Sequence, residues 1–347
     1  MTVLMKGNEA IAEAAIRAGC DAYFGYPITP QTEILEYMSR RMPDLGRAFV
    51  QAESELGAIN MVYGAACTGA RSMTTTSSPG YSLMQEGVSY LAMSFVPCVI
   101  VNIMRGGPGL GNIQPAQGDY FQMTKGGGHG DYNLLVLAPS TVQETVDLVV
   151  EAFDLAEKYR QPVTVIADGL IGQIMEPVEF PELTKPRRRR HPWALTGAKG
   201  RSKNIITSLF LGSQNLEREN IILQERIEDI RANEVRYAEY MMEGADIAVV
   251  AYGTAGRIVQ TAVKQARVEG IPVGLFRTIS MFPFPLVELE WIAESVRHIL
   301  VVELSAGQMI EDVRLATNCR RPISFFGKMG GIVPLPDDVL NEIRKLA

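Results

Sequence analysis

Short apolar runs rich in β-branched residues alternate with longer segments of helical periodicity from Met5 to Pro181. This alternation is typical of an α/β fold with a largely parallel sheet. The apolar runs predict strands over residues 22–26, near 49, and over 73–76, 99–104, 134–138 and 163–166. The periodic segments predict helices over 8–19, 32–41, 54–67, from 82 onward and over 141–158, with Asn8 capping the first of them.

The same rhythm resumes near Ile247, where strands are predicted over 247–251, 273–276 and 299–302 and helices over 257–269, 287–297 and 309–317. Between the two α/β parts, the proline-flanked basic run 185–192, which includes Arg187–Arg190, predicts an exposed connector. The sequence assigns no role to these arginines. A charged segment over 216–242 predicts one exposed helix. We therefore expect three parts, with bounds at 1–182, 183–244 and 245–347.

Residues 105–132 contain nine glycines and show neither a helical nor a strand period. A loop this long inside a compact domain is usually functional. The glycines from Gly106 to Gly111 raise the alternative of a dinucleotide site and hence of a dinucleotide-dependent oxidoreductase. That interpretation is weak, because no helix-forming segment follows Gly111 and no acidic residue closes a second strand at the expected place.

Composition and charge narrow the function classes. Of the 347 residues, 47% are hydrophobic and 21% are charged, which suffices for large cores. The 33 basic and 39 acidic side chains leave a net charge of −6, so the chain has no overall electrostatic footprint for nucleic acid or an anionic membrane. The apolar stretch 88–104 is too short and too often interrupted to span a bilayer, and the N-terminus does not resemble a signal peptide.

The four cysteines lie far apart in the sequence, at Cys20, Cys67, Cys98 and Cys319. Without a Cys-x-x-Cys pair they form neither a zinc ribbon nor an iron–sulfur cluster from this chain alone. We expect reduced, mostly buried thiols and a cytoplasmic protein.

Four predicted strands of the first part lead into segments whose side chains could bind a ligand or take part in catalysis. Open α/β sheets bind ligands beyond the carboxyl ends of their strands. The four segments are the proline-rich turn Gly25–Pro30, the acidic junction Gln51–Ala58, the hydroxyl-rich loop Thr74–Tyr81 and the glycine-rich Arg105–Gly111. Glu53 and Glu55 flank Ser54 and point different ways, so we expect one of them to face a site and the other to cap a helix or meet solvent.

The order of these segments resembles the alpha subunit of the 2-oxoacid:ferredoxin oxidoreductases, and the order is more specific than any single motif. The resemblance continues through Gln117–Tyr120 and His129–Asp131 and into the second α/β part at Gly274–Pro285 and Gly327–Pro334, so it covers nearly the whole chain. Within the family the chain looks most like the 2-ketoisovalerate (branched-chain) enzymes, judging from Trp193–Gly200 and Asn233–Tyr237. The segment Thr278-Ile-Ser-Met departs from the family pattern, which leaves the fold secure and the specificity less so.

The resemblance implies a pyrimidine-type thiamine diphosphate domain followed by a smaller domain like the C-terminal domain of transketolase. In such enzymes a carboxylate hydrogen-bonds the ring nitrogen of the aminopyrimidine, and Glu55 matches it. Arg105 matches the arginine that holds the oxoacid carboxylate, and Thr29 matches the threonine near the substrate carbonyl. Cofactor contacts are implied for these residues beside Glu55: Tyr26, Pro27, Ile28, Ser78, Gly80 and Tyr81.

For His129, we favour an ordinary loop residue over a role in proton transfer. It is one of three histidines in the chain and lies within a run of glycines.

The chain lacks the Gly-Asp-Gly and Asn-Asn segments that usually bind the metal and the diphosphate in thiamine enzymes. The resemblance therefore implies a heteromer in which a beta subunit supplies the Mg²⁺ half of the site and gamma- and delta-type partners carry the iron–sulfur clusters. The implied reaction converts a 2-oxoacid and coenzyme A into acyl-CoA and CO₂ while reducing ferredoxin. We expect an exposed apolar patch around the cleft, where the partner binds. A non-catalytic structural subunit of such a complex stays as an alternative.

Overall fold

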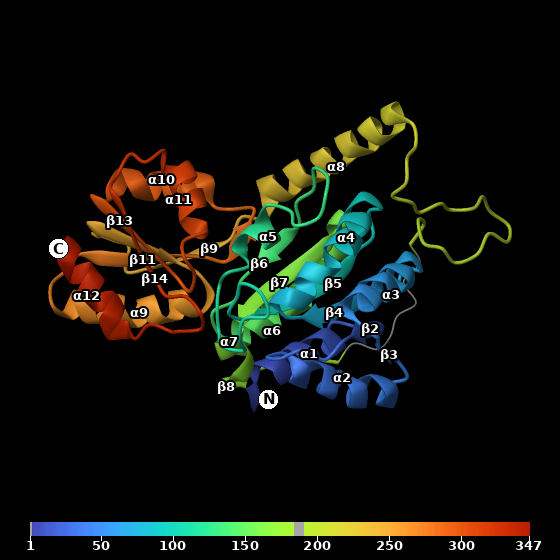
Figure 1. Ribbon diagram of the computed structural model, residues 1–347, viewed down its shortest axis with the longest axis horizontal. Coiled ribbons are helices and arrows are strands. Elements are labelled where there is room, and N and C mark those ends of the chain that lie inside the picture. Colours follow the sequence, from blue (N-terminus) through green and yellow to red (C-terminus); the bar gives the residue numbers. More distant parts are fainter. Residues whose placement is uncertain (1, 184–190) are drawn as a thin grey trace.

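The computed structural model describes residues 2–183 and 191–347, so Arg187–Arg190 and the rest of the basic run up to residue 190 lie outside the described residues. Two α/β units lie side by side, each built on its own sheet (Figure 1). We call them the seven-stranded unit and the five-stranded unit. The predicted α/β class with largely parallel sheets is confirmed.

The seven-stranded unit contains the larger sheet, in which β2 to β7 run parallel and β12 pairs antiparallel with β6. Its strands, from one edge to the other, are β12 (Ser280–Phe282), β6 (Leu135–Leu137), β7 (Pro162–Asp168), β5 (Cys98–Met104), β4 (Ser72–Thr76), β2 (Ala22–Gly25) and β3 (Ala48–Gln51). The central strands are buried along their whole length, which explains why they read as continuous apolar runs rather than as alternating ones.

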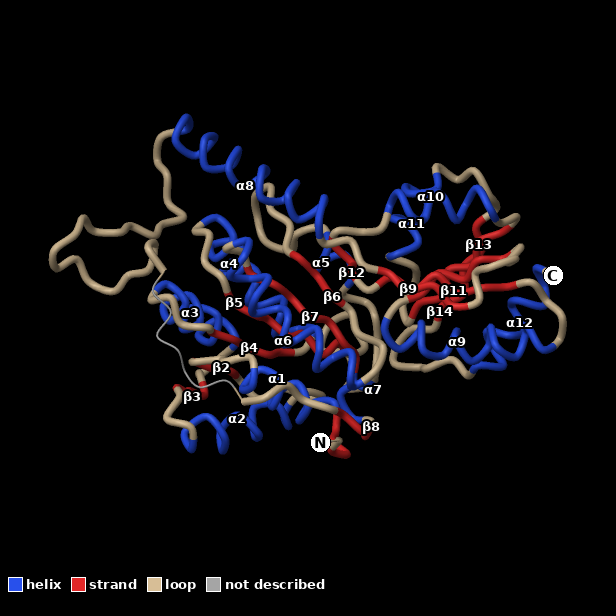
Figure 2. Tube along the Cα trace, turned by 180° about the vertical axis from the view of Figure 1, so that it is seen from behind, coloured by secondary structure: helices blue, strands red, loops and turns tan. Residues whose placement is uncertain are grey.

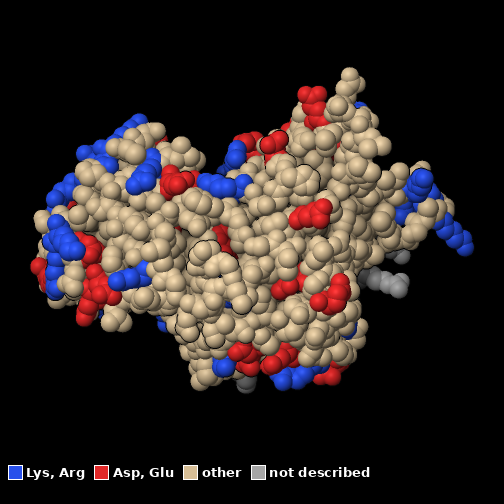
Figure 3. All heavy atoms as spheres, viewed as in Figure 1, with Lys and Arg blue, Asp and Glu red and all other residues tan. Residues whose placement is uncertain are grey.

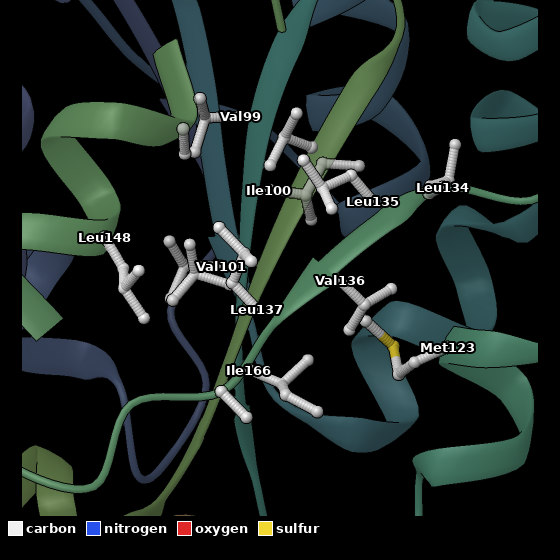
Figure 4. Packing of buried hydrophobic residues seen from close by; sticks show 14 of the residues in the cluster. Val99, Ile100, Val101, Met123, Leu134, Leu135, Val136, Leu137, Leu148 and Ile166 are labelled. Carbon is white, nitrogen blue, oxygen red and sulfur yellow. The ribbon is translucent and has the colours of Figure 1, made fainter. Parts of the chain in front are cut away.

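Helices cover both faces of this sheet (Figure 2). One face carries α1 (Gly7–Arg17), α2 (Thr32–Asp44) and α6 (Val142–Tyr159), and the other carries α3 (Glu55–Cys67) and α4 (Ser78–Met93). The short helices α5 (Tyr120–Thr124) and α7 (Gly169–Gln173) follow loops at the end of the unit, and β1 (Val3–Lys6) pairs with β8 (Met175–Val178). Figure 4 shows the core where β5, β6 and β7 meet, with Ile100, Val136 and Ile166 packed together.

The five-stranded unit has the strand order β14 (Ile323–Gly327), β13 (His298–Glu303), β10 (Ile247–Ala251), β11 (Val273–Thr278) and β9 (Tyr237–Tyr240). Helices α9 (Gly253–Val268) and α12 (Pro336–Leu346) pack on one face, and α10 (Leu286–Ser295) and α11 (Met309–Thr317) lie on the other. The long helix α8 (Ser213–Asn233) leads from the seven-stranded unit to this one (Figure 1).

Several sequence-based boundaries are wrong. The helix predicted over 216–242 ends at Asn233, because Tyr237–Tyr240 pairs as an edge strand with β11. Helix α9 begins at Gly253 instead of 257, so Gly253 and Gly256 belong to the helix. The segment 105–132 contains the five-residue helix α5, whose Tyr120 and Met123 are buried. Strand β12 was not predicted at all, although it joins the two units through the larger sheet.

Three of the four cysteines, Cys20, Cys67 and Cys98, are buried and Cys319 is exposed; all four are free thiols, as predicted. In the described part of the chain, no helix has both the length and the apolar character that a membrane span requires.

Candidate active site

The four candidate functional segments that follow these strands lie next to one another at one edge of the larger sheet. Strands β3, β2, β4 and β5 are consecutive neighbours in that sheet and run parallel, so their carboxyl ends meet. The chain leaves these ends at Gln51, Gly25, Thr76 and Met104. The structure thus brings all four segments to a common edge.

The turn that carries Thr29 is anchored from inside by Gln31, which is fully buried. The Gln31 amide group donates to the Tyr26 carbonyl at 3.2 Å and accepts a hydrogen bond of 2.6 Å from Thr75 on β4. Thr75 in turn is hydrogen-bonded to the Tyr23 hydroxyl at 2.6 Å. This network holds the turn while Thr29 stays exposed at its tip.

The remaining residues of the turn are accessible to different degrees: Tyr26 and Ile28 are half-buried and Pro27 is exposed. On the other side of the turn, the Pro30 carbonyl accepts a hydrogen bond of 2.7 Å from the Asn8 side chain. Asn8 also binds Glu33, so its side chain does not cap α1 as predicted. Instead it ties the first helix to the turn.

Glu55 lies in the first turn of α3, which Ser54 caps by accepting a hydrogen bond of 3.2 Å from the Gly57 amide. Its side chain is buried, with 4% of its surface exposed. A side chain at Gly80 would place its Cβ 2.4 Å from the Glu55 Oε1 atom and 2.1 Å from the Thr76 hydroxyl, so only glycine leaves room there. The neighbouring Glu53 is exposed and folds back over the helix start, so the two carboxylates separate as expected.

Helix α4 begins at Ser78, four residues earlier than predicted, because Pro79 at its first turn favours helix initiation. The Ser78 hydroxyl accepts a hydrogen bond of 3.0 Å from the Arg105 amide and donates one of 2.6 Å to Asp119. The only proton of this hydroxyl is therefore donated to Asp119 and is not available to a ligand. The Tyr81 ring is buried in the core, with 1% exposure, so it does not reach the surface at which the cofactor was predicted to bind.

Arg105 leaves the end of β5 and reaches back toward the Thr29 turn. One terminal nitrogen of its guanidinium donates to the Thr29 carbonyl at 2.9 Å, and the other donates to the Leu110 carbonyl at 3.1 Å. None of the described acidic side chains forms a salt bridge with Arg105. A guanidinium has five N–H donors, so each terminal nitrogen keeps one N–H for a carboxylate, while the Nε–H is buried without a described partner.

Arg105 lines a cavity of about 690 Å³ between the two units. Ser78, Asp119 and the backbone of Gly106 line the side of the seven-stranded unit, and Ser305 and Gln308 line the side of the five-stranded unit. The cavity therefore needs both units.

Exposed apolar side chains belong to the segments at the strand ends and to the cavity wall: Val50, Leu56, Leu83, Leu110, Ile113 and Met329, which we call the apolar rim. Leu110 is 84% exposed. Figure 3 shows that most of the surface over α4 and the neighbouring loop is uncharged. An exposed apolar surface of this kind is typical of an interaction site.

The long glycine-rich segment is fixed by the five-stranded unit. Gln117, which is fully buried, donates to the Tyr252 carbonyl at 2.9 Å and accepts a hydrogen bond of 2.9 Å from the Leu304 amide. Further along, His129 is exposed among glycines, and the structure gives it no described hydrogen bond. No helix begins at Gly111, so the structure contains no dinucleotide-type turn here.

Sequence reasoning missed Asp119, which is 8% exposed and lies between Ser78 and Asn102. Burial raises the pKa of the Asp119 carboxyl, while hydrogen bonds from Ser78 and Asn102 act in the opposite direction. The signal was present in the motif Gln117–Tyr120, but its spacing alone does not show that a hydroxyl 41 residues away is the partner.

The Glu55 carboxylate provides the test of whether thiamine diphosphate fits. The Glu55 side chain is 4% exposed, and none of the described residues donates a hydrogen bond to its carboxylate. The carboxylate can therefore accept a hydrogen bond from an N–H group of a ligand. Together with the glycine at position 80, this geometry fits the aminopyrimidine of thiamine diphosphate.

The fold and this site define the class as thiamine-diphosphate-binding α/β proteins. A structure titled split gene transketolase, inactive beta4 tetramer, shares the fold with a TM-score of 0.63 and 15% identity, and the match covers 98% of this chain and 97% of that one. Residues 13–243 match the family model described as pyruvate flavodoxin/ferredoxin oxidoreductase, thiamine diP-binding. Residues 245–339 match pyruvate:ferredoxin oxidoreductase core domain II.

Relatives narrow this class. The chain is 52% identical to ketoisovalerate oxidoreductase subunit VorB of Methanothermobacter thermautotrophicus, over 100% of this chain and 98% of that protein. It is 38% identical to 2-oxoglutarate synthase subunit KorA of Methanothermobacter marburgensis, over 98% and 97%. The structure of a 2-oxoglutarate:ferredoxin oxidoreductase from Magnetococcus marinus, with 2-oxoglutarate, coenzyme A and succinyl-CoA bound, matches with a TM-score of 0.90 and 27% identity. That match covers 99% of this chain and 65% of the other. The chain therefore belongs to the 2-oxoacid:ferredoxin oxidoreductase family.

Proposed function

We propose that this chain is the alpha subunit of a heteromeric 2-oxoacid:ferredoxin oxidoreductase and supplies the aminopyrimidine half of its thiamine diphosphate site. The observation that carries the proposal is the buried Glu55 carboxylate, which lacks a described donor and faces Gly80 at the strand ends. When bound, thiamine diphosphate supplies the carbon nucleophile for decarboxylation of the oxoacid. Glu55 binds the aminopyrimidine ring nitrogen and shares a proton with it.

Arg105 and Thr29 act on the oxoacid. The free N–H groups of Arg105 bind its carboxylate, since a planar guanidinium matches that anion. The exposed Thr29 hydroxyl lies on the turn whose carbonyl Arg105 already binds at 2.9 Å, so it is suited to orient the neighbouring keto oxygen. Tyr26, Pro27 and Ile28 of the same turn, with Ser78 and Gly80, form the wall against the cofactor.

The apolar rim supports a partner at this face. We propose that a beta subunit covers the rim and supplies the Mg²⁺ and diphosphate half, because this chain has no Gly-Asp-Gly and Asn-Asn segments. Iron–sulfur clusters on gamma- and delta-type subunits pass electrons to ferredoxin, and coenzyme A accepts the acyl group. The four free thiols agree with a cytoplasmic enzyme.

We assign residues 1–182 to the pyrimidine-type domain, 183–244 to the connector with α8, and 245–347 to the transketolase-C-terminal-like domain. The similarity to a ketoisovalerate oxidoreductase subunit favours a branched-chain 2-oxoacid as substrate.

Purification of the chain with its native partners, followed by an assay of a 2-oxoacid panel with viologen dye as electron acceptor, tests the proposal. We expect reduction of the dye that depends on thiamine diphosphate, with branched-chain oxoacids giving the highest kcat/KM. If the complex reduces no dye with any 2-oxoacid, the chain is a structural subunit. If it reduces dye with a straight-chain or dicarboxylic oxoacid instead, the activity stands and the substrate assignment fails.

A further inference from the structure

The two ends of the glycine-rich loop Gly106–Gly118 are held together by hydrogen bonds to one hydroxyl group. We call this pair of joined ends the neck of the loop. At one end, the Arg105 amide donates to the Ser78 hydroxyl at 3.0 Å. At the other end, the Asp119 carboxylate accepts a hydrogen bond of 2.6 Å from the same hydroxyl. A single serine at the start of α4 therefore connects the residues that precede and follow the loop.

Asp119 binds this hydroxyl as a buried acceptor. Its Oδ2 atom also accepts a hydrogen bond of 2.9 Å from Asn102 on β5. The hydrogen bonds from Ser78 and Asn102 compensate for its burial, and the positive charge of Arg105 adds to them. The carboxylate thus connects the loop to β5 and α4 together.

The neck determines where the Arg105 guanidinium lies. The backbone of Arg105 is held by Ser78, and one guanidinium nitrogen is held by the Leu110 carbonyl, which belongs to the loop itself. If the neck opens, the Arg105 backbone keeps its bridge to Pro115, but it loses the Ser78 contact, and the loop that carries the Leu110 anchor is less firmly held. The Thr29 carbonyl alone would then hold the side chain firmly.

We propose that Asp119 is a positioning residue: through the Ser78 hydroxyl it closes the neck of the glycine-rich loop and holds Arg105 in the orientation that receives the oxoacid carboxylate. The proposal rests on the function proposed for Arg105. It adds a residue that does not itself touch the substrate carboxylate.

The test uses Asp119→Ala, Asp119→Asn, Ser78→Ala and the double Asp119→Ala/Ser78→Ala variant in the assembled complex. Asp119→Ala removes the charge-assisted hydrogen bond to the Ser78 hydroxyl, so it should raise KM for the oxoacid by about tenfold. Its kcat should stay within about twofold. Asp119→Asn keeps an acceptor oxygen and should restore KM to within about threefold of the unmodified enzyme.

The double variant separates a shared contact from two independent ones. If Asp119 acts through Ser78, the double variant should raise KM no more than Ser78→Ala alone, because Asp119 then has no hydroxyl left to hold. Asp131→Ala is the control, since Asp131 is an exposed acidic residue of the same glycine-rich segment.

A second readout does not depend on turnover. The Gly106 amide donates to the Gln114 carbonyl at 2.9 Å, and the Asn112 amide donates to the Gly106 carbonyl at 2.9 Å. Hydrogen exchange at these amides should accelerate in Asp119→Ala and Ser78→Ala and stay slow in Asp119→Asn and Asp131→Ala.

Two outcomes overturn the proposal. If Asp119→Asn and Asp119→Ala both lower kcat strongly and to the same extent, Asp119 is an acid–base group. Unchanged KM and unchanged exchange in Asp119→Ala remove any positioning role. The Arg105→Lys variant separates these two outcomes from failure of the proposed function. If KM is unchanged in Arg105→Lys, the role proposed for Arg105 fails. If KM rises there but not in Asp119→Ala, only the role of Asp119 fails.

Discussion

Two fully buried glutamines anchor the two segments that hold the candidate substrate-binding groups, and they do so over very different distances. Gln31 holds the Thr29 turn through Tyr26 and Thr75, all within the seven-stranded unit. Gln117 holds the glycine-rich loop through Tyr252 and Leu304, which belong to the five-stranded unit. The first anchor is completed inside one unit, and the second exists only when the two units are packed together.

This difference explains how the work is divided between the units. Glu55 and the Thr29 turn depend on strand ends and helix starts of one sheet, so their geometry is fixed when that sheet forms. Arg105 starts on the same sheet but is held by a loop that the other unit fixes. The five-stranded unit therefore contributes to substrate binding by positioning the loop and by lining the 690 Å³ cavity.

The largest effect on turnover is expected for Glu55, whose position is fixed within the seven-stranded unit alone. Glu55→Gln in the assembled enzyme should lower kcat by at least ~10²-fold, the low end for general acid–base catalysis, because the amide does not exchange a proton with the cofactor ring. Glu53→Gln is the matched control, since Glu53 is an exposed carboxylate two residues away. Steady-state kinetics with viologen dye measures both. Equal losses at the two positions would remove the assignment of Glu55.

The second largest effect is expected for Arg105, which is held by a loop that both units fix. Arg105→Lys should raise KM for every oxoacid by about tenfold, because a point charge replaces a planar guanidinium and loses about one charge-assisted hydrogen bond. The affinity of the complex for thiamine diphosphate should hardly change. Titration of the cofactor alongside the KM measurement checks this. Weakened cofactor binding with an unchanged KM would reassign Arg105 to the cofactor.

The smallest kinetic effect is expected when the glutamines themselves are replaced. Gln117→Leu leaves the Leu304 amide unpaired, which costs roughly 1–3 kcal/mol of stability, while the Tyr252 carbonyl keeps its hydrogen bond of 3.0 Å from the Gly256 amide. We expect faster hydrogen exchange over residues 106–118 and an increase in oxoacid KM of about threefold.

Gln31→Leu is the matched variant. It should lower the melting temperature of the complex while leaving exchange over 106–118 as slow as in the unmodified enzyme. If both variants accelerate exchange of the loop equally, the two anchors are not independent and the comparison fails.

The parts of the site that could be predicted are those fixed locally. The apolar runs at β2, β4 and β5 and the residues that follow them predicted which segments meet, because parallel neighbours place their carboxyl ends at one edge. The resemblance then singled out Glu55, whose burial against Gly80 agrees with the role it implied.

The parts that were not predicted depend on partners far away in the sequence. The hydrogen bonds of Gln117 reach across 135 and 187 residues, and the two-residue pairing of β12 with β6 has no local period to reveal it. Helix α5 is only five residues long, and glycines surround it, so periodicity could not identify it. Tyr81 looks like a site residue in its motif, but its position on the inner side of α4 places the ring in the core.

The central claim is that this chain holds only the aminopyrimidine half of a cofactor site that a partner completes. Titration calorimetry of the lone full-length chain with thiamine diphosphate and Mg²⁺ tests it most directly, once a cooperative thermal transition shows that the chain is folded. A dianionic diphosphate needs a metal and donors that the claim places on the partner, so we expect no binding at micromolar concentrations. Binding should appear when the beta subunit is added. Micromolar binding by the lone chain would mean that it contains a complete diphosphate site, and that result would contradict the account.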